Sequence, residues 1–348
     1  MNTALMKLKS SMEQKGIEAV LVTDINNVFY LSGFTGTSAY LIIDNNNNYI
    51  FTDFRYIQQA GEQCEGFTVI DIKETEKCEK IYSSYQVCGF EDLNISLSLF
   101  NKFRKKFKAV CPIGLLIYDL RKVKTEKEIS LIKKAQQITD MAYSHILTFA
   151  KKGMTEKEIA LELEFFMRKN GASAVSFDII CASGERGALP HADTTDRKLC
   201  EGELVVLDFG CIYEGYMSDM TRTFGVGYVS DDIKDVYDTV LEAQTEVLKH
   251  IAPGKICSDM HKIAENVIDK KYPGTFGHGL GHSVGIEIHE SPNFSPRCDD
   301  VICPGNVITV EPGIYIPHKV GVRIEDMVVI TEDGYENITK SSKELIYI

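Results

Sequence analysis

The stretch LVVLDFGCIYEGYMSDMTRTF, residues 204–224, decides how the second half of the chain folds. It places Asp208 inside an apolar run typical of a buried strand, and Asp219 just beyond a Tyr-Glu-Gly turn. A buried carboxylate is costly unless a partner compensates its charge. If the Tyr-Glu pair forms a two-residue hairpin loop, the two aspartates face each other with Cβ atoms ~5 Å apart. A cation, the nearby Arg222 or a shared proton could each compensate this pair.

A second apolar segment, VITVEPGIYIPHKVGVRIEDMVVI, contains another pair of acids. Glu311 and Glu325 are each seven residues from His318, so a hairpin centred on that histidine sets them face to face. Arg323 then lies on the same strand face as Glu325, because side chains alternate along a strand. A single strand glutamate is usually exposed at an edge. Two hairpins that each oppose a pair of acids favour a shared cation site instead.

The segment GTFGHGLGHSVGIEIHESP adds His278, His282 and His289 within twelve residues. The glycines around the first two argue against a helix, in which each would cost ~1 kcal/mol. They favour a loop that brings imidazoles close to a ligand. A single histidine is more often structural, but three this close together indicate a site. His191, in the turn-rich loop CASGERGALPHADTT, adds little by itself.

The combined set is two aspartates, two glutamates and one to four histidines. A structural zinc site would prefer cysteine and histidine. Oxygen-rich ligation with one nitrogen suits Mn²⁺, Co²⁺ or Fe²⁺ as well as Zn²⁺. Because four carboxylates carry more charge than one divalent ion balances, we expect two ions. At ~3.5–4 Å apart they would hold a bridging hydroxide, which is a nucleophile at neutral pH.

The bulk composition excludes several classes of partner. The chain has 348 residues and a formal net charge of −12, which argues against binding nucleic acid or an anionic membrane surface. The N-terminus lacks the apolar core of a signal peptide, and no run approaches the ~20 apolar residues of a membrane span. Ten cysteines without the paired spacing of a zinc site indicate reduced packing residues. A cytoplasmic location is therefore expected.

The first 120 residues predict an α/β domain with a mixed sheet, because short strands and helices alternate along them. The strands expected near its start are the apolar runs VFYLSGF, SAYLIID and YIFTDF. The tract of four asparagines at residues 45–48 is expected to be a hairpin loop.

Residues 121–348 predict a second domain of α+β type, in which helices and antiparallel strands come in blocks. Thr125 and Thr155 each precede a glutamate by three residues, which is the capping-box signature of a helix start. Two further helices are expected at residues 231–250 and 257–270.

These motifs together resemble a known family. The ordered set PHA, LDFG…SDMTRTF, GHGLGHSVGIEIHE, VEPGIY and RIED resembles the pita-bread metallopeptidases. The N-terminal FYLSGFTGTSAYLII…FTDFRY resembles the additional domain of their Xaa-Pro branch, which contains aminopeptidase P, prolidase and the metal-free creatinases. The resemblance covers essentially the whole chain. It implies a creatinase-like α/β domain at 1–120 and a pita-bread catalytic domain at 121–348, with metals in the concave face of a curved antiparallel sheet.

The resemblance implies five metal ligands. Asp208 would chelate one ion, and Asp219 and Glu325 would bridge both. His282 and Glu311 would bind the second ion, and Glu311 would also help to deprotonate the bridging water. The ions would be Mn²⁺ or Co²⁺, with Zn²⁺ or Fe²⁺ as alternatives.

The resemblance also implies roles for residues around the metals. His278 and His289 would contact the scissile carbonyl and stabilise the oxyanion. His191 would line the proline side of the pocket and assist the departing nitrogen. Arg323 would orient metal-bound carboxylates, and Thr221 is a candidate hydrogen-bond partner of a ligand.

The implied activity is hydrolysis of Xaa-Pro bonds, which are tertiary amides without an N–H. Our first prediction is an Xaa-Pro aminopeptidase, which would act on peptides with proline at the second position through a metal-bridging hydroxide. An Xaa-Pro dipeptidase (prolidase) is the alternative. A metal-free creatinase-type hydrolase and a non-enzymatic pita-bread binding protein are more remote, because all five ligand positions carry metal-capable side chains.

A homodimer is also implied by the resemblance. Since the chain has no tryptophan, any aromatic that closes the pocket must be Phe or Tyr.

Overall fold

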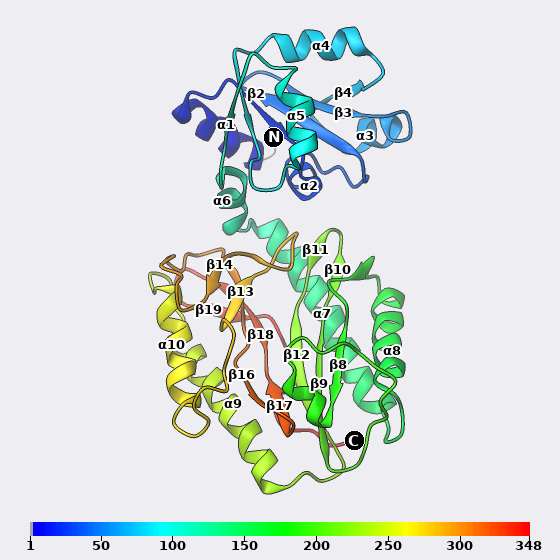
Figure 1. Cartoon of the computed structure of the whole chain (residues 1–348), viewed down its shortest axis with the longest axis vertical. Helices are drawn as coiled ribbons and strands as arrows, with labels where there is room; N and C mark the ends of the chain where they lie inside the picture. Colours follow the sequence, from blue (N-terminus) through cyan, green and yellow to red (C-terminus); the bar gives the residue numbers. More distant parts are fainter. Residues whose placement is uncertain (1–2) are drawn as a thin grey trace. The chain divides into compact units, whose positions relative to one another are not determined.

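The computed structural model describes residues 3–348 and divides into two compact units between Leu120 and Arg121 (Figure 1). None of the helices within residues 3–348 combines the length and apolar composition that crossing a bilayer requires.

The first unit is built on a six-stranded sheet with the order β4-β3-β2-β1-β5-β6. β2 pairs antiparallel with β1 and β3, and the remaining pairs are parallel, so the predicted mixed sheet is confirmed. Its strands are β1 Ala19–Val22, β2 Ala39–Asp44, β3 Asn48–Thr52, β4 Thr68–Asp71, β5 Val87–Phe90 and β6 Ala109–Pro112. The helices are α1 Thr3–Lys15, α2 Ile25–Ser32, α3 Ile57–Gln63, α4 Thr75–Ser83, α5 Leu97–Arg104 and α6 Leu116–Lys122.

One predicted strand of this unit is wrong: most of VFYLSGF lies in the helix α2. Asp24 caps this helix, since its side chain accepts hydrogen bonds from two backbone N–H groups of the first turn. Gly33 ends it with φ 75°, a conformation that glycine adopts readily. Val28 and Leu31 are fully buried at helical spacing. An apolar run of this length does not by itself distinguish a strand from a buried helix.

The second unit contains four α-helices and a set of antiparallel strand pairs among the described residues, so the predicted α+β class is confirmed. The helices are α7 Glu126–Phe149, α8 Glu156–Lys169, α9 Asp231–His250 and α10 Cys257–Ile268, with a short 3-10 helix η1 at Gly184–Ala188. The strands of its first half are β7 Ala174–Val175, β8 Ile180–Ser183, β9 Glu203–Phe209, β10 Cys211–Tyr213, β11 Tyr216–Met217 and β12 Met220–Val226. Those of its second half are β13 Gly281–Ser283, β14 Glu290–Phe294, β15 Val307–Val310, β16 Gly313–Ile316, β17 Val320–Arg323, β18 Asp326–Ile330 and β19 Tyr335–Asn337.

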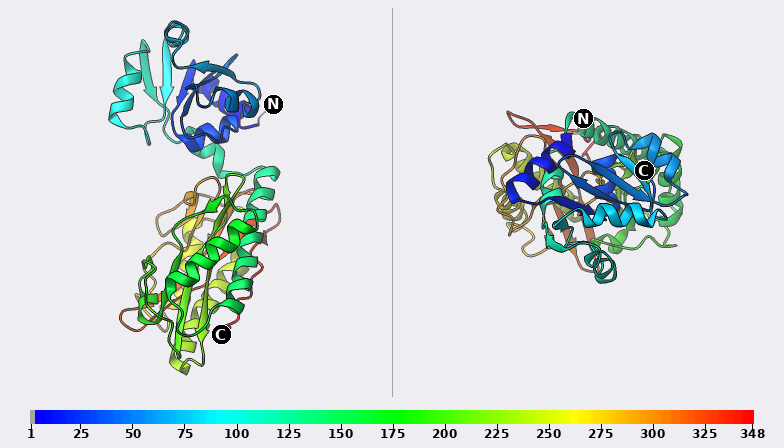
Figure 2. Two further views of the ribbon diagram at one scale, coloured as in Figure 1. Left: turned by 90° about the vertical axis from the view of Figure 1, so that its right-hand side faces the viewer. Right: turned by 90° about the horizontal axis from the view of Figure 1, so that it is seen from above.

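Each half of this unit packs two helices against its own strands. The helices α7 and α8 share an apolar core with β8, β9 and β12 and lie side by side on the outer face (Figure 2). The helices α9 and α10 share a second core with the strands from β14 to β18. Both predicted capping boxes are confirmed, because the N-cap residues Thr125 and Thr155 exchange hydrogen bonds with Glu128 and Glu158. The strands between the two helix pairs carry the candidate site.

The first predicted hairpin forms, but its register is wrong. The loop consists of Glu214 and Gly215, with φ of 47° and 84°, one residue later than predicted. A two-residue loop of this kind needs positive φ at both positions, so it takes in the glycine. Asp208 therefore pairs with Thr221, and Asp219 lies diagonal to Asp208 rather than opposite it. Because side chains alternate along a strand, this shift keeps both aspartates on one face.

The second predicted hairpin has the predicted register, with a turn centred on His318 (φ 58°). Strand pairs on both sides of Glu311 and Glu325 keep these glutamates opposite each other. The pairs are Val310 with Asp326, Gly313 with Arg323 and Ile316 with Val320.

Candidate metal centre

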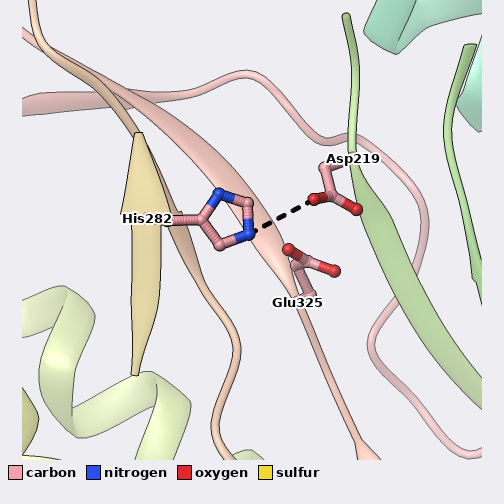
Figure 3. Close-up of side chains that lie close together, drawn as sticks. All are labelled: Asp219, His282 and Glu325. Atoms are coloured by element: carbon pink, nitrogen blue, oxygen red, sulfur yellow. Dashed lines mark ion pairs between the residues drawn. The ribbon is translucent and has the colours of Figure 1, made fainter. Parts of the chain in front are cut away.

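The five predicted ligands come from separate strands and strand connections of the second unit. Asp208 lies on β9 and Asp219 between β11 and β12. His282 lies on β13, Glu311 follows β15, and Glu325 lies between β17 and β18. Asp219, His282 and Glu325 point toward one another, and one ligand atom from each lies within 4.8 Å of the other two (Figure 3).

Backbone contacts between the two halves hold this arrangement. The Glu325 N–H donates to the Thr221 carbonyl at 3.1 Å. The Thr223 hydroxyl donates to the Arg323 carbonyl at 3.0 Å and accepts from the Arg323 N–H at 3.3 Å. The strand β12 of the first half therefore lies beside the end of β17 from the second half. This contact brings the acids of both hairpins to one place.

The histidine strand β13 approaches closely because it carries a glycine. A Cβ atom at Gly281 would lie 2.0 Å from the Thr309 carbonyl oxygen, which no side chain could tolerate. The next residue, His282, donates its backbone N–H to the Thr309 hydroxyl at 3.0 Å. The glycine-rich run predicted as a loop thus includes a short strand that presents His282 to the acids.

The imidazole of His282 is oriented as a metal ligand. Its Nε2 lies 3.3 Å from Glu311 Oε1 and 3.6 Å from Asp219 Oδ2. Its Nδ1 lies 3.3 Å from the Ser283 carbonyl oxygen, which can only accept a hydrogen bond. With its proton on Nδ1 alone, the ring would direct the Nε2 lone pair at the acids, as in metal-binding histidines. In the metal-free protein burial opposes protonation, but the hydrogen bond and charge of Glu311 raise the pKa of His282, which favours a second proton on Nε2.

The carboxylates carry more negative charge than the nearby cations compensate. Burial and the neighbouring acids raise the pKa of both Asp219 and Glu325 well above their ordinary values. Burial likewise raises the pKa of Asp208, against the opposing effect of Arg323. Burial would also raise the pKa of Glu311, but the hydrogen bond and charge of His282 lower it to about 2.

Among the five candidate ligands, two buried carboxylate oxygens have no hydrogen-bond partner within residues 3–348. They are Asp208 Oδ1 and Glu325 Oε1. The other oxygens of these groups are held: Asp208 Oδ2 pairs with Arg323, and Glu325 Oε2 accepts from the Thr221 hydroxyl at 2.8 Å. Buried polar atoms are nearly always paired. Unpartnered oxygens on Asp208 and Glu325, together with the imidazole of His282, are a donor set that fits a divalent cation.

Arg323 and Tyr315 form a buried hydrogen-bonded chain to His278. The guanidinium of Arg323 donates to the Tyr315 hydroxyl at 2.7 Å, so this hydroxyl is left to donate to His278 Nε2 at 2.9 Å. The Nδ1 of His278 then carries the proton and donates to the Gly279 carbonyl at 2.7 Å. Burial lowers the pKa of His278 and raises that of Tyr315 to about 12, which is consistent with both groups being neutral.

Tyr315 was not identified from the sequence. The sequence pattern that indicates Tyr315 is the alternation of side chains along a strand. Glu311 and Tyr315 are four residues apart, so their side chains lie on the same face. Arg323 lies on the partner strand of the same hairpin. Period-two spacing from a predicted ligand could therefore have found Tyr315.

His289 and His191 lie at the exposed rim. The rings of His289 and His282 are in edge-to-face contact, with centroids 4.4 Å apart. Although His289 is exposed overall, its ring loses part of its solvation beside His282, and this desolvation together with His282 lowers its pKa. His191 is exposed, and the carbonyl of the preceding Pro190 accepts from Arg323 at 3.2 Å. The structure thus brings both histidines to the centre without burying them.

Arg222 does not compensate the two aspartates, so that alternative is wrong. Its guanidinium lies 2.7 Å from Asp326 and donates to the carbonyls of residues 341 and 342. Arg222 pairs across the strand with Leu207, the neighbour of Asp208, and so points to the opposite face. Arg323 is the cation that contacts Asp208.

Comparison with known proteins identifies the family. The chain is 42% identical to the solved structure of an Xaa-Pro dipeptidase from Bacillus anthracis, with a TM-score of 0.95 over 99% of both chains. It is 37% identical to an Xaa-Pro dipeptidase of Pyrococcus horikoshii over 99% of both chains. It is 38% identical to the structure of an X-Pro aminopeptidase from Thermotoga maritima, with a TM-score of 0.90 over 97% of this chain and all of the other. Residues 5–123 match the creatinase/prolidase N-terminal domain, and residues 130–332 match metallopeptidase family M24. The chain therefore belongs to metallopeptidase family M24 and carries a creatinase/prolidase N-terminal domain.

Proposed function

We propose that this chain hydrolyses Xaa-Pro bonds with two divalent ions held by its five ligand residues. The observation that carries the proposal is the pair of unpartnered buried oxygens on Asp208 and Glu325, in a centre where Asp219, His282 and Glu325 bring ligand atoms within 4.8 Å of one another. Relatives of similar length that are Xaa-Pro dipeptidases supply the substrate class. Mn²⁺ or Co²⁺ is the proposed metal.

The acids and the imidazole would share the ions. Asp219 and Glu325, whose ligand atoms lie within 4.8 Å of each other, would hold both ions, and His282 with Glu311 would complete the second. When bound, the ions would supply a nucleophile at neutral pH and polarise the scissile carbonyl. Arg323 holds one oxygen of Asp208 and leaves the other available. Against the effect of burial, the neighbouring His282 and Arg323 lower the pKa of Glu311 in the metal-free protein, and its Oε1 is the atom that would accept the proton of the attacking water.

The rim histidines would act on the substrate. His289 is neutral at neutral pH, because desolvation and His282 lower its pKa, so one ring N–H can donate to the developing oxyanion. His191 would stand on the proline side and assist the departing nitrogen. Both ring nitrogens of His278 are engaged within the protein, so its proposed contact with the scissile carbonyl would require Tyr315 to release it.

Among Xaa-Pro peptidases, we place the dipeptidase first, because the Bacillus anthracis and Pyrococcus horikoshii relatives are dipeptidases. The aminopeptidase expected from the sequence stays the second candidate, favoured by the likeness to the Thermotoga maritima X-Pro aminopeptidase. The homodimer and the cytoplasmic location also stay predictions.

The first experiment compares hydrolysis of Ala-Pro and Ala-Pro-Ala, after chelation and readdition of Mn²⁺ or Co²⁺. We expect no turnover by the chelated protein and recovery with either ion. Cleavage of Ala-Pro alone would identify a dipeptidase, and cleavage of Ala-Pro-Ala at the first bond an aminopeptidase. Cleavage of neither substrate, with metal bound, would overturn the proposal.

Replacing Tyr315 by Phe should lower kcat/KM roughly 10-fold, as typical for a residue that orients a metal site. The change removes the hydroxyl that joins Arg323 to His278 but keeps the ring, which is almost fully buried. Metal content should stay at the wild-type value, because no proposed ligand is lost. Steady-state kinetics and elemental analysis measure the two effects. Tyr228→Phe, at an exposed position, is the control. Loss of bound metal in the Tyr315 variant would contradict a role limited to orientation.

A further inference from the structure

We propose that Glu156 is a positioning residue that fixes the loop carrying His191. The loop, residues 184–194, connects the end of β8 to the segment before β9. A single buried carboxylate closes both of its ends and thereby sets where His191 meets the substrate. The inference rests on the proposed function, in which His191 acts on the leaving group.

The carboxylate of Glu156 is fully buried and accepts four hydrogen bonds, two on each oxygen. Oε1 accepts from the backbone N–H and the hydroxyl of Ser183, at 2.9 and 2.7 Å. Oε2 accepts from the backbone N–H and the hydroxyl of Thr195, at 3.0 and 2.7 Å. Ser183 directly precedes the loop and Thr195 directly follows it. The two oxygens therefore hold the two ends of the loop together.

The middle of the loop lies against the metal centre. A Cβ atom at Gly321 would lie 1.7 Å from the Gly187 carbonyl oxygen, so the 3-10 helix η1 packs backbone to backbone on β17. Three residues later, the Pro190 carbonyl accepts from Arg323, which also pairs with Asp208. His191 follows at once. With its ends held by Glu156 and its middle on β17, the loop has little freedom to move this histidine.

Helix capping does not explain why Glu156 is buried. The helix α8 already has a complete capping box from Thr155 and Glu158, and Glu158 serves it from an exposed position. Glu156 lies one residue after the N-cap and points instead to the loop ends. A buried charge is stabilised only while its hydrogen bonds are made. Ser183 is held in β8 by its pairing with Val205, so an open loop would take the two Thr195 donors away from Glu156 Oε2, and burial of this oxygen favours the closed loop.

Two neighbouring arginines support the same loop ends. Arg186, within η1, has its Nε 3.4 Å from Glu156 Oε2. Arg197 donates to the Ser183 hydroxyl at 2.6 Å and forms a two-point ion pair with Glu203, at 2.8 and 2.6 Å. These contacts place positive charge beside the Glu156 carboxylate, and they leave its four hydrogen bonds to the loop ends.

The test combines Glu156→Gln with a change at His191. A glutamine offers one acceptor oxygen, so its NH₂ group must face the donors of one loop end and release that end. Glu158→Gln is the matched control, because it removes a carboxylate from the same helical turn without touching the loop. Each change is made in two backgrounds, the wild-type chain and the His191→Ala variant. Ala-Pro hydrolysis, metal content and amide exchange of residues 184–194 are measured for all of them.

We expect Glu156→Gln to lower kcat/KM roughly 10- to 100-fold when His191 is present, since misplacing a reacting group by ~1 Å can cost 100-fold. In the His191→Ala chain the same change should have an effect below ~3-fold, because residues acting as a unit are not additive. Amide exchange in the loop should accelerate at least ~10-fold in Glu156→Gln, as expected for the loss of buried hydrogen bonds. Glu158→Gln should change neither quantity, and metal content should stay constant.

An equal loss in both backgrounds, or unchanged loop exchange, would overturn the proposal. Full activity of the His191→Ala variant would contradict both the proposed role of His191 and the proposal that Glu156 acts through it. If the wild-type protein cleaved no Xaa-Pro peptide, the proposed function would fail, and loop exchange would still decide whether Glu156 holds the loop. Should Glu156→Gln not fold, Thr195→Ala removes one of the four bonds from the loop side, and the same exchange and activity changes are expected at ~3-fold.

Discussion

Replacing Glu325 by Gln is expected to abolish hydrolysis and, at the same time, to stabilise the metal-free protein. Loss of this proposed ligand would remove several kcal/mol of the transition-state stabilisation that the metals would supply, so activity should fall at least ~1,000-fold. The free energy of unfolding of the metal-free protein should rise instead, because the change removes a negative charge from a cluster of acids. Without metal, Glu325 is almost fully buried and lies among other acids, which raise its pKa together with burial. The neutral amide relieves this repulsion and keeps an acceptor for the Thr221 hydroxyl.

The gain in the free energy of unfolding should be roughly 1–3 kcal/mol, since like charges a few ångströms apart repel by about that much inside a protein. Denaturant unfolding of chelated wild type and variant measures it. Adding Mn²⁺ should stabilise the wild type by mass action but not the variant. Glu336→Gln, an exposed glutamate on β19, is the control for the same chemical change. A less stable metal-free variant would show that repulsion does not dominate the centre, and full activity would remove Glu325 from the ligand set.

Replacing Arg222 by Met should cost about 3–5 kcal/mol of unfolding free energy, the usual result of removing one partner from a buried ion pair. Arg222 has no exposed surface, and Asp326 beside it is equally buried. The change leaves that carboxylate with Lys343 as its remaining cation. It also removes the guanidinium donor from four backbone carbonyl oxygens, those of Thr221, Glu325, Ser341 and Ser342; the Thr221 carbonyl keeps the Glu325 N–H as a donor.

Urea unfolding at neutral pH measures this loss. Lys343→Met is the matched control, because it removes the other cation on Asp326 from a partly exposed position and should cost only about 1 kcal/mol or less. Adding Asp326→Asn to the Arg222 variant should recover part of the loss, since it removes the uncompensated charge. A loss below ~1 kcal/mol for Arg222→Met would mean that water or a rearranged Lys343 replaces the guanidinium.

The features predicted correctly are those whose cause is local in sequence. The capping boxes at Thr125 and Thr155 need only four residues each, and both form. The hairpin centred on His318 was also located correctly, because apolar runs on both sides of Pro-His-Lys leave little freedom for its register. The loop of the first hairpin was predicted one residue too early. The two-residue loop needs positive φ at both positions, so it includes Gly215, and the symmetric placement of the two aspartates does not determine its position. Alternation still kept the correct face, so the error did not alter the candidate ligands.

Other features depend on contacts between segments that are far apart in the chain. The hydroxyl of Tyr315 matters because it meets His278, 37 residues away. The partner of Arg222 is Asp326, 104 residues away, although two aspartates lie much closer in sequence. The apolar face of helix α2 is buried against the sheet of its own unit. A short apolar run in the sequence does not show whether it forms such a buried helix or a strand. Such pairings follow from the tertiary packing rather than from local patterns.

The spacing of the acids has a consequence for synthesis on the ribosome. The first two aspartates leave the exit tunnel before any of the other proposed ligands, because His282 and the glutamates follow only after two long helices. A nascent chain that stops before β13 holds a pair of carboxylates and none of the remaining donors. It would therefore compete poorly for metal in the cell. With the proposed ligand set, loading would wait until the last hairpin has paired, and only a chain whose two halves have docked would take up the ions.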